Sequence, residues 1–191
     1  DNCGISSLSA SNLNYTTANV GNNSVTITAV DASGNTSSCI TNVYVIEPAP
    51  HAICKNTTIY LDANGQASIV PADIDNGSYS LVGISNRVVS QSTFDCTNVG
   101  TNNVWLTVYN TFNASDSCMA TVTVIDSISP TVFTNNVTVQ LDAFGQASIT
   151  TSMIDNSSFD NCTIDNLALD ITSFTCANVG NNTVTLTATD V

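Results

Sequence analysis

Two kinds of side chain in this sequence could do chemistry: hard oxygen ligands and cysteines. Carboxylate and amide side chains recur in short polar segments between strand-like runs, and calcium prefers about six to eight such oxygens. Loops that converge at one end of a domain can supply them, so these segments predict calcium sites. The alternative is that Asp and Asn cap turns through local hydrogen bonds. The predicted ligands are Asp1, Asp31, Glu47, Asp73, Asp75, Asn76, Asp126, Asp155, Asp160 and Asp190, with Asn2, Asn35, Asp116 and Asn161 beside them.

The chain has seven cysteines and no CxxC pair. That usage indicates disulfides formed in an oxidising compartment rather than a zinc site. Asn-x-Ser/Thr sequences, the acceptors of N-linked glycans in secreted proteins, occur ten times. Asn56, Asn113 and Asn136 are the glycosylation candidates. Both features favour an extracellular or cell-surface protein.

Composition argues against catalysis and against two classes of partner. His51 is the only histidine, and its place in a proline-rich segment predicts an exposed linker residue rather than a catalytic base. Lys55 and Arg87 are the only basic residues against fifteen acidic ones, for a formal net charge of −13. Nucleic acid binding needs a basic surface, so it is excluded. No apolar run approaches the ~18 residues of a membrane-spanning helix, so membrane insertion is not expected.

The elements that must position these side chains occur in repeated copies. The phrase NVGNNSVTITAVD (Asn19–Asp31) returns as NVGTNNVWLTVYN (Asn98–Asn110) and as NVGNNTVTLTATD (Asn178–Asp190), at spacings of 79 and 80 residues. LDANGQASI and LDAFGQASI also repeat at a spacing of 80 residues. A repeat of about 80 residues divides the chain into a partial first copy (1–47), a complete second copy (48–127) and a partial third copy (128–191).

Apolar and polar residues alternate within the repeated phrase, which is the pattern of a half-buried β-strand. Gly and Asn mark the turns, and no window of helical period competes. Short alternating strands with frequent turns predict an all-β chain of tandem immunoglobulin-like β-sandwiches. The residues expected on the inward face are Val25, Ile27 and Ala29, then Val104, Leu106 and Val108, then Val184, Leu186 and Ala188.

The first and third copies are incomplete by comparison with the second. The first lacks the two opening strands, and the third lacks the closing strand that CITNVYVI and CMATVTVI supply in the other copies. A sandwich short of a strand exposes unpaired backbone groups at its edge. We therefore expect a window cut from a longer array. Residues 178–191 are predicted to form a strand whose free edge continues into, or abuts, further polypeptide.

Several of these motifs resemble a known family. DNCG (Asp1–Gly4), VTITAVDASGNTSSC (Val25–Cys39) and the Pro-bearing segment before AICKNTTI (Ala52–Ile59) are similar to the hyalin-repeat (HYR) domain. They resemble most closely the four-cysteine HYR-like repeats of large surface adhesins from flavobacteria and their relatives. The resemblance implies an immunoglobulin-like fold, secretion through the type IX system, and a role in adhesion, gliding or extracellular fibres without catalysis.

The resemblance also implies a disulfide pattern. The chain departs from the family at three cysteine positions, which hold Thr17, Val82 and Thr134. An immunoglobulin-like sandwich favours a Cys54–Cys118 bond within the second copy. Two pairings remain open for Cys162: a bond to Cys96 of the preceding copy, or a local bond to Cys176. The first alternative explains why Thr17 and Val82, which would face each other, are both not cysteine.

The sequence therefore predicts a non-catalytic structural or adhesive segment of a long extracellular cell-surface or filament protein. Its partners would be neighbouring repeats of the same chain or other copies in a fibre. The alternative is a module that recognises carbohydrate, such as surface glycans, or protein. Exposed aromatic residues would favour recognition, and Trp105, expected on an outward face, with Tyr109 is the one hint of such a cluster.

Overall fold

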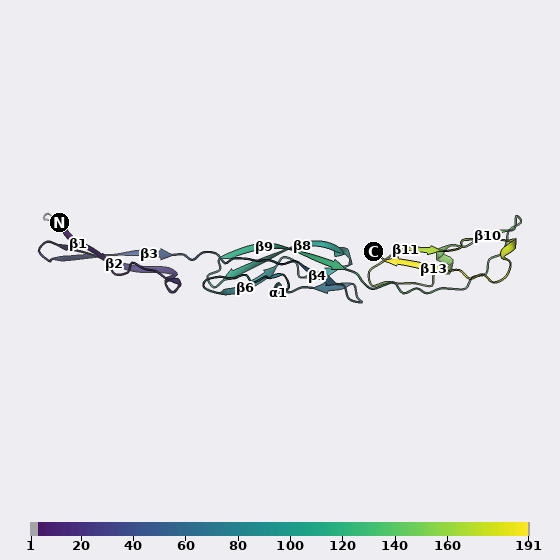
Figure 1. Cartoon of the computed structure of the whole chain (residues 1–191), viewed down its shortest axis with the longest axis horizontal. Coiled ribbons are helices and arrows are strands. Elements are labelled where there is room, and N and C mark those ends of the chain that lie inside the picture. The colour runs from purple at the N-terminus through teal and green to yellow at the C-terminus, as the bar shows by residue number, and fades with distance from the viewer. Residues whose placement is uncertain (1–3, 191) are drawn as a thin grey trace. The chain divides into compact units, whose positions relative to one another are not determined.

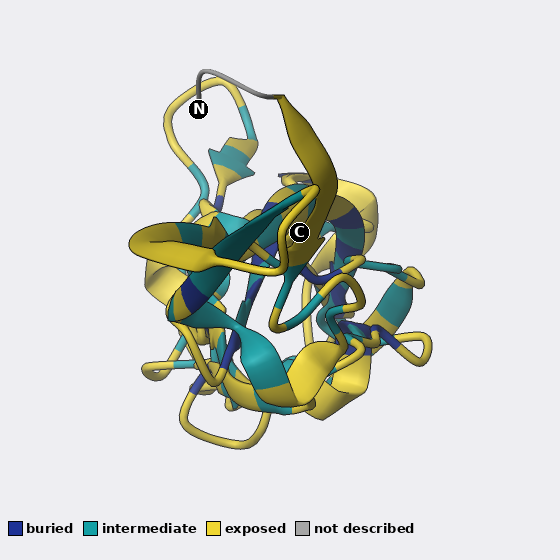
Figure 2. Cartoon of the chain, turned by 90° about the vertical axis from the view of Figure 1, so that its left-hand side faces the viewer, coloured by how far each residue is buried: buried dark blue, intermediate teal, exposed yellow. Residues whose placement is uncertain are grey.

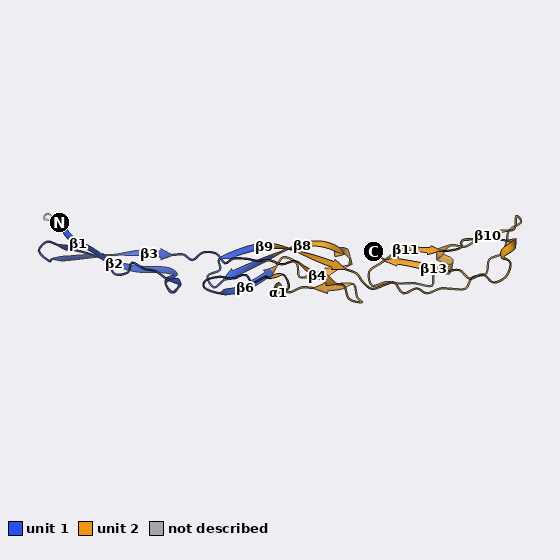
Figure 3. Ribbon diagram, viewed as in Figure 1, with its two compact units in different colours: residues 1–53, 76–88, 106–118 blue, residues 54–75, 89–105, 119–191 orange. Residues whose placement is uncertain are grey.

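The computed structural model describes residues 4–190, which are built almost entirely of β-strands (Figure 1). The predicted all-β class is confirmed. The chain divides into two compact units whose boundary crosses the second copy (Figure 3). Unit 1 contains residues 1–53, 76–88 and 106–118, and unit 2 contains residues 54–75, 89–105 and 119–191. The passage from the first copy to the second thus lies inside unit 1, and the passage from the second to the third lies inside unit 2.

Unit 1 begins with a three-stranded antiparallel sheet of order β1-β2-β3. Its strands are β1 (Ile5–Ala10), β2 (Gly21–Asp31) and β3 (Thr36–Val45), and the 3-10 turn η1 (Thr17–Asn19) precedes β2. The β2–β3 ladder runs without interruption from Gly21↔Val45 to Val30↔Thr36. Asp31 closes the hairpin, because its carboxylate accepts hydrogen bonds from the N–H groups of Ser33 and Asn35.

The second copy contributes a four-stranded sheet of order β4-β9-β8-β6. Its strands are β4 (Thr57–Tyr60), β6 (Ile84–Val89), β8 (Gly100–Asn110) and β9 (Ser115–Ile125). In unit 2, β4 lies parallel to the end of β9, from Thr57↔Val122 to Tyr60↔Ile125. A two-stranded antiparallel sheet pairs β5 (Gln66–Ser68) with β7 (Thr93–Asp95). The helix α1 (Pro71–Ile74) follows β5, and the 3-10 turn η2 (Cys96–Asn98) follows β7.

The third copy, also in unit 2, repeats several of these elements. β10 (Gln146–Ser148) pairs with β12 (Ser173–Thr175), and α2 (Thr151–Ile154) follows β10. β11 (Ile164–Leu169) pairs with β13 (Leu186–Asp190), and η3 (Cys176–Asn178) follows β12.

The core forms where the sequence alternates with a period of two. Val104, Leu106 and Val108 of β8 are fully buried, as predicted. In the third copy, Ile149, Ile154, Phe174 and Leu186 form the buried cluster, with Val184 half-buried against it. In the first copy, Val25 is buried, whereas Ile27 and Ala29 are only half-buried. Figure 2 marks the buried residues in dark blue.

The strand predicted over residues 178–191 is shorter than expected. Residues 176–178 form η3, and β13 begins only at Leu186, whereas β2 and β8 begin at Gly21 and Gly100. The prediction was wrong for residues 178–185, because strand backbone groups need a ladder partner. The early residues of β2 pair with the end of β3, while the ladder of β13 with β11 covers only Leu186–Asp190. Likewise residues 137–140, which match β4 in sequence, are not in a strand.

Candidate functional site

A disulfide joins the second copy to the third. Cys96 and Cys162 are bonded, with their Cα atoms 5.4 Å apart and a sequence separation of 66. The sequence leaves two partners open for Cys162. In the structure its partner is Cys96, whereas Cys176 is a free, exposed thiol. This covalent bond limits the separation of the second and third copies, and we call it the inter-copy disulfide.

The remaining described cysteines fall into two groups. Cys54 and Cys118 are each disulfide-bonded, and Cys39 is a free, exposed thiol like Cys176. The predicted Cys54–Cys118 pairing stays a prediction. Cys3 lies outside the described residues.

The 3-10 turn η2 fixes the position of Cys96. Asp95 caps it: its carboxylate accepts hydrogen bonds from the hydroxyl of Thr97 at 2.6 Å and from the N–H of Thr97 at 2.9 Å. These bonds, led by the one from the hydroxyl, hold the pKa of Asp95 below its usual value. The N–H of Asp95 donates to Asn98 Oδ1 at 3.0 Å, and the other two copies make the same bond from Thr16 to Asn19 and from Thr175 to Asn178. All three copies thus build the same turn, but the first begins it with Thr17 instead of cysteine.

A glycine turn brings the backbone of the second copy against the inter-copy disulfide. Gly65 adopts a φ of +70°, in a turn whose Asp62 carboxylate accepts from the N–H groups of Asn64 and Gln66. These bonds lower the pKa of Asp62, and the bond from Gln66 contributes most to that shift. A Cβ on Gly65 would lie 2.6 Å from Cys96 Sγ and 2.8 Å from the Asn161 carbonyl oxygen. Only glycine fits this position, because both the φ and the close approach exclude a side chain.

Two predicted calcium ligands, Asp126 and Asp160, lie beside this disulfide with Asn161. We call residues 62–65, 96, 126 and 160–162 the second junction. Asn161 Nδ2 donates to Asp126 Oδ1 at 3.1 Å and to the Asp62 carbonyl oxygen at 3.3 Å. The N–H of Cys162 donates to Asp160 Oδ2 at 2.9 Å. Asp126 Oδ2, Asp160 Oδ1 and Asn161 Oδ1 are shielded from solvent without a hydrogen-bond partner.

The corresponding place in unit 1 has different side chains. We call Glu47, residues 51–53 and 78–82, Asn110 and Asp116 the first junction. Asn110 is fully buried, and its amide donates to Glu47 Oε1. Ser80, Leu81 and Val82 stand where the second junction has Asp160, Asn161 and Cys162. Of the positions that correspond to Asp126 and Asp160, only the first, Glu47, is therefore a carboxylate, and neither position of the inter-copy disulfide is a cysteine.

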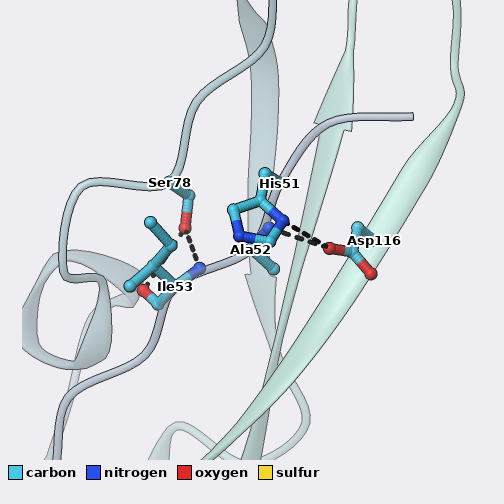
Figure 4. Close-up of polar contacts among 5 residues, drawn as sticks. All are labelled: His51, Ala52, Ile53, Ser78 and Asp116. Atoms are coloured by element: carbon cyan, nitrogen blue, oxygen red, sulfur yellow. Dashed lines mark hydrogen bonds and ion pairs between the residues drawn. The ribbon is translucent and has the colours of Figure 1, made fainter. Parts of the chain in front are cut away.

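The linker of the first junction is held through its main chain (Figure 4). The N–H of Ala52 donates to Asp116 Oδ2 at 2.9 Å, and the N–H of Ile53 donates to Ser78 Oγ at 2.9 Å. His51 exchanges two backbone hydrogen bonds with Tyr79, at 2.7 and 3.1 Å. The Ala52 bond is the main cause that lowers the pKa of Asp116, and the nearby charge of His51 adds to it. Asp116 thus fixes the direction in which the chain enters the second copy.

The grouping of Ser78, His51 and Asp116 in Figure 4 does not have the geometry of a catalytic triad. His51 Nδ1 is 3.9 Å from Asp116 Oδ2, which is too long for a hydrogen bond. The Ser78 hydroxyl is nearly buried and bonds to the main chain of Ile53 rather than to the imidazole. The His51 side chain is exposed, as predicted. These residues instead form hydrogen bonds that hold the linker in place.

Three other predicted calcium ligands, Asp31, Asp73 and Asp155, close local turns. Asp73 accepts from the N–H of Val70 at 2.7 Å at the start of α1, and Asp155 accepts from the N–H of Ser158 at 3.0 Å. The pKa of Asp155 is lowered mainly by the Ser158 hydroxyl, and that of Asp31 by the side-chain amide of Asn35. Within residues 4–190, no three or more His, Cys, Asp or Glu side chains gather as a metal site.

Four predicted ligands remain, and three of them lie in the described part of the chain. Asp75 forms a β-bridge with Cys54, and the N–H of Asn76 donates to the Ile53 carbonyl oxygen. Asp190 pairs with Ile164 at the end of β13. Asp1 lies outside the described residues.

The glycosylation candidates and Trp105 lie on the surface. Asn56, Asn113 and Asn136 are exposed, although Asn56 Oδ1 also accepts a hydrogen bond from the N–H of Thr121. Trp105 is 50 % exposed, so its predicted outward orientation is confirmed, and Tyr109 is half-buried.

The sequence did not predict that side-chain amides and main-chain groups make the hydrogen bonds of both junctions. Asn110 occupies the hairpin position of Asp31, but it also reaches Glu47, which lies 63 residues away in sequence. Asp62 contributes its carbonyl oxygen rather than its carboxylate to Asn161. The sequence DNC, present at both Asp1–Cys3 and Asp160–Cys162, is the signal that could have tied Asn161 to the disulfide.

No protein-family model and no curated protein matches this sequence. Among solved structures, protocadherin gamma B7 extracellular cadherin domains 1–4 are similar at 12% identity and a TM-score of 0.32, covering 98% of this chain and 59% of that chain. PcdhgB3 EC1-4 is similar at 11% identity and a TM-score of 0.29, covering 67% of this chain and 38% of that chain. The chain thus spans less than two thirds of either protein, and likeness at these scores supports no functional conclusion. Among residues 4–190, no helix has the length and apolar character to cross a bilayer.

Proposed function

We propose that this chain is a non-catalytic structural segment of a long extracellular adhesin or filament, built from tandem immunoglobulin-like repeats of the HYR-like kind. Its task is to hold successive repeats in a fixed order and direction so that the array transmits force without extending. Neighbouring repeats of the same chain, or other copies in a fibre, are its partners.

The inter-copy disulfide carries this proposal. A disulfide within one domain stabilises that domain, but Cys96 and Cys162 join successive copies of the repeat, at a sequence separation of 66. Under tension, such a bond keeps the intervening residues from extending. Disulfides persist in oxidising compartments, which supports an extracellular location.

Cys176 supports the same arrangement for a further repeat. It opens η3 as Cys96 opens η2. Gly145, with a φ of +73°, faces Cys176 Sγ as Gly65 faces Cys96 Sγ, since a Cβ on either glycine would lie 2.6 Å from the sulfur. Cys176 is free and exposed, so this thiol is available to a DNC loop such as that of Asp160–Cys162 in another repeat. The proposal therefore includes Cys176 as the next point of inter-repeat bonding.

Distances between spin labels test whether the second junction is the stiffer one. Labels on non-natural amino acids replace Tyr60 and Phe144 in unit 2, and Tyr44 and Phe112 in unit 1; all four side chains are exposed. We expect a narrower distance distribution for the first pair. The variant C96A/C162A should broaden it toward that of the second pair. Equal widths in the unaltered protein, or no broadening in the variant, would contradict the proposal.

A recognition module is the second candidate, and the exposed Trp105 is the observation that favours it. Aromatic faces bind sugars by stacking, and Trp105 alternates on β8 with the buried Val104 and Leu106. A glycan array probed with the protein and with W105A separates the two functions. We expect no binding that depends on Trp105. Binding that W105A abolishes would favour recognition over a purely structural role.

A further inference from the structure

The two turns that meet the inter-copy disulfide in the second copy are built again in the third copy. Asp142 Oδ1 accepts hydrogen bonds from the N–H groups of Phe144 and Gln146 at 2.8 and 2.9 Å, which repeats the turn of Asp62. The 3-10 turn η3 begins with a cysteine, as η2 does. We call residues 141–145 and 176–179 the outer surface of the third copy.

Exposure distinguishes the outer surface from its counterpart in the second copy. Val179 is 77 % exposed, whereas Val99, at the same position of the second copy, is 39 % exposed. Cys176 is exposed and Cys96 is half-buried. Phe144 is 89 % exposed at the tip of its turn. Exposed apolar side chains that gather at one place mark interaction sites, so this surface is a candidate for binding another repeat.

The second copy shows what kind of segment binds there. The segment of residues 160–162 lies against its two turns: Cys162 is bonded to Cys96, and the Asn161 amide donates to the Asp62 carbonyl oxygen at 3.3 Å. A Cβ on Gly65 would lie 2.8 Å from the Asn161 carbonyl oxygen. The partner of such a surface is therefore an Asp-Asn-Cys segment whose asparagine and cysteine both make contacts.

The sequence Asp-Asn-Cys occurs twice in the chain, at residues 1–3 and 160–162. The strands that follow the two segments pair in the same register. Each strand begins at an isoleucine, Ile5 or Ile164, that is paired with an aspartate, and each ladder has one irregularity directly after it. In both segments the cysteine lies two positions before this isoleucine. Segment 1–3, which lies outside the described residues, thus precedes its strand as segment 160–162 does.

We propose that the outer surface binds Asp1, Asn2 and Cys3 of a second copy of this chain, and that Cys176 forms a disulfide with that Cys3. Segment 160–162 is already bonded within its own chain, so segment 1–3 is the one that matches Cys176. Asn2 takes the place of Asn161 and donates to the carbonyl oxygen of Asp142. This inference rests on the proposed function, because it names a partner for Cys176.

Formation of this bond is an oxidation, and a small disulfide such as oxidised glutathione completes it by thiol–disulfide exchange. The thiolate of Cys3 attacks the small disulfide, and one glutathione thiolate leaves. The thiolate of Cys176 then attacks the mixed disulfide on Cys3, and the second glutathione thiolate leaves. The two cysteines lose two protons and two electrons, and the oxidant becomes two thiols. Cys176 is accessible to this exchange, because its thiol is free and exposed.

The contact joins two different surfaces, so it does not produce a closed, symmetric dimer. Each copy uses Cys176 toward one neighbour and Cys3 toward another. A heterologous contact of this kind generates an open chain of copies when the rotation between them does not close a ring. The proposal therefore predicts oligomers of many sizes, whereas a bond between two Cys176 thiols would stop at the dimer.

Mixing two variants of the full chain tests the pairing. Both carry C39S, which removes the other free, exposed thiol; one also carries C3S and the other C176S. Each is incubated in a glutathione redox buffer, alone and in an equimolar mixture, and separated on a non-reducing gel. We expect monomers from each variant alone, and a disulfide-bonded dimer without larger species from the mixture. No dimer in the mixture, or a disulfide-bonded dimer from either variant alone, would overturn the proposal.

Failure of this test would leave the proposed structural function intact, because that function rests on the inter-copy disulfide and is tested by label distances within one chain. Equal label widths would contradict the proposed function, whereas the dimer of the mixture would still form.

Peptide mapping and one further variant separate docking from random oxidation. Cleavage before aspartate yields fragments 1–30 and 170–189, each with a single cysteine, and the dimer should contain these two linked. Adding N2A to the C176S variant should slow dimer formation about tenfold, because the asparagine no longer donates to the turn. S7A, at an exposed position of β1, is the matched control and should leave the rate unchanged. A rate that N2A does not lower would overturn the docking surface.

Discussion

The two junctions occupy equivalent places between successive copies, yet they hold the chain by different means. The second uses a covalent bond, the close approach of Gly65 to Asn161, and the hydrogen bond from the Asn161 amide to the Asp126 carboxylate. Both linkers are held by a main-chain hydrogen bond to a serine of the following copy, from Ile53 to Ser78 and from Phe133 to Ser158. The first junction adds the bond from the N–H of Ala52 to Asp116 and one buried amide, that of Asn110. Both junctions lie within compact units, so each is an ordered contact of the fold.

The comparison shows that one pair of positions distinguishes the two junctions. Thr17 and Val82 stand at the two positions that Cys96 and Cys162 occupy one copy further on. The turn that would hold a cysteine at position 17 is nevertheless retained, because η1 has the same hydrogen bond between its first and last residues as η2. The turn that carries one of the two cysteines is thus present at both junctions.

The largest effect is expected from removing the inter-copy disulfide. In the chain-entropy model, closing a loop of this size contributes about 4 kcal/mol. The variant C96A/C162A should therefore lose several kcal/mol, chiefly through unfolding of the third copy, as measured by chemical denaturation with hydrogen exchange of residues 128–190. C39S removes a free, exposed thiol and should change little. A loss below about 1 kcal/mol would show that the bond does not stabilise the third copy.

The converse change should make the first junction resemble the second. In T17C/V82C, we expect a new disulfide under oxidising conditions and a gain of about 2 kcal/mol, because the turn around Thr17 is already formed. Mass spectrometry of tryptic peptides under non-reducing conditions identifies the bond. The single variant V82C controls for the loss of the valine side chain. If both new thiols stayed free, the two junctions would differ in backbone geometry as well as in sequence.

Alanine at two matched glycines should separate backbone strain from junction contact. Gly65 and Gly145 have φ values of +70° and +73°, so alanine strains both by a similar amount, about 1 kcal/mol. At Gly65 the new Cβ would also meet the Asn161 carbonyl oxygen, whereas at Gly145 it would meet only the sulfur of the free Cys176. We expect G65A to cost about 1–2 kcal/mol more than G145A in denaturant unfolding. Equal losses of unfolding free energy in the two variants would mean that the Asn161 backbone moves away from the new Cβ at little cost in stability.

The smallest effect concerns the pH dependence of the first junction. The pKa of Asp116 is lowered from 3.8, first by the hydrogen bond from Ala52. Its contribution to stability is therefore present above pH 3.8 and lost as the pH falls through the lower folded value. The amide proton shift of Ala52, followed by NMR, should titrate in that acid range and become independent of pH there in D116N. A midpoint above 3.8 would contradict the assignment.

Much of the fold follows from the sequence, because alternation in phrases such as that of Val104, Leu106 and Val108 demands a strand with one buried face. The beginning of β13 did not follow, because a strand also needs a ladder partner. In the described chain the ladder of β13 begins only at Leu186, and before it Thr185 exchanges hydrogen bonds with Asp170 alone. The inter-copy disulfide could be named only as one of two alternatives, since its geometry depends on contacts between copies. Asp73 and Asp155 look like ligands in sequence, yet each caps its own turn, a local choice that composition does not reveal.

Force spectroscopy with handles at Ser92 and Ile171 tests the central claim most directly, because both residues lie just outside the bonded pair. When the inter-copy disulfide is intact, the segment between Cys96 and Cys162, a sequence separation of 66, cannot be extended by the applied force. The account predicts that C96A/C162A lengthens the fully extended segment by about 230 Å relative to the unaltered protein, at ~3.5 Å per residue. A gain below about 50 Å would show that Cys162 bonds elsewhere in solution, and it would contradict a covalent joint between successive repeats.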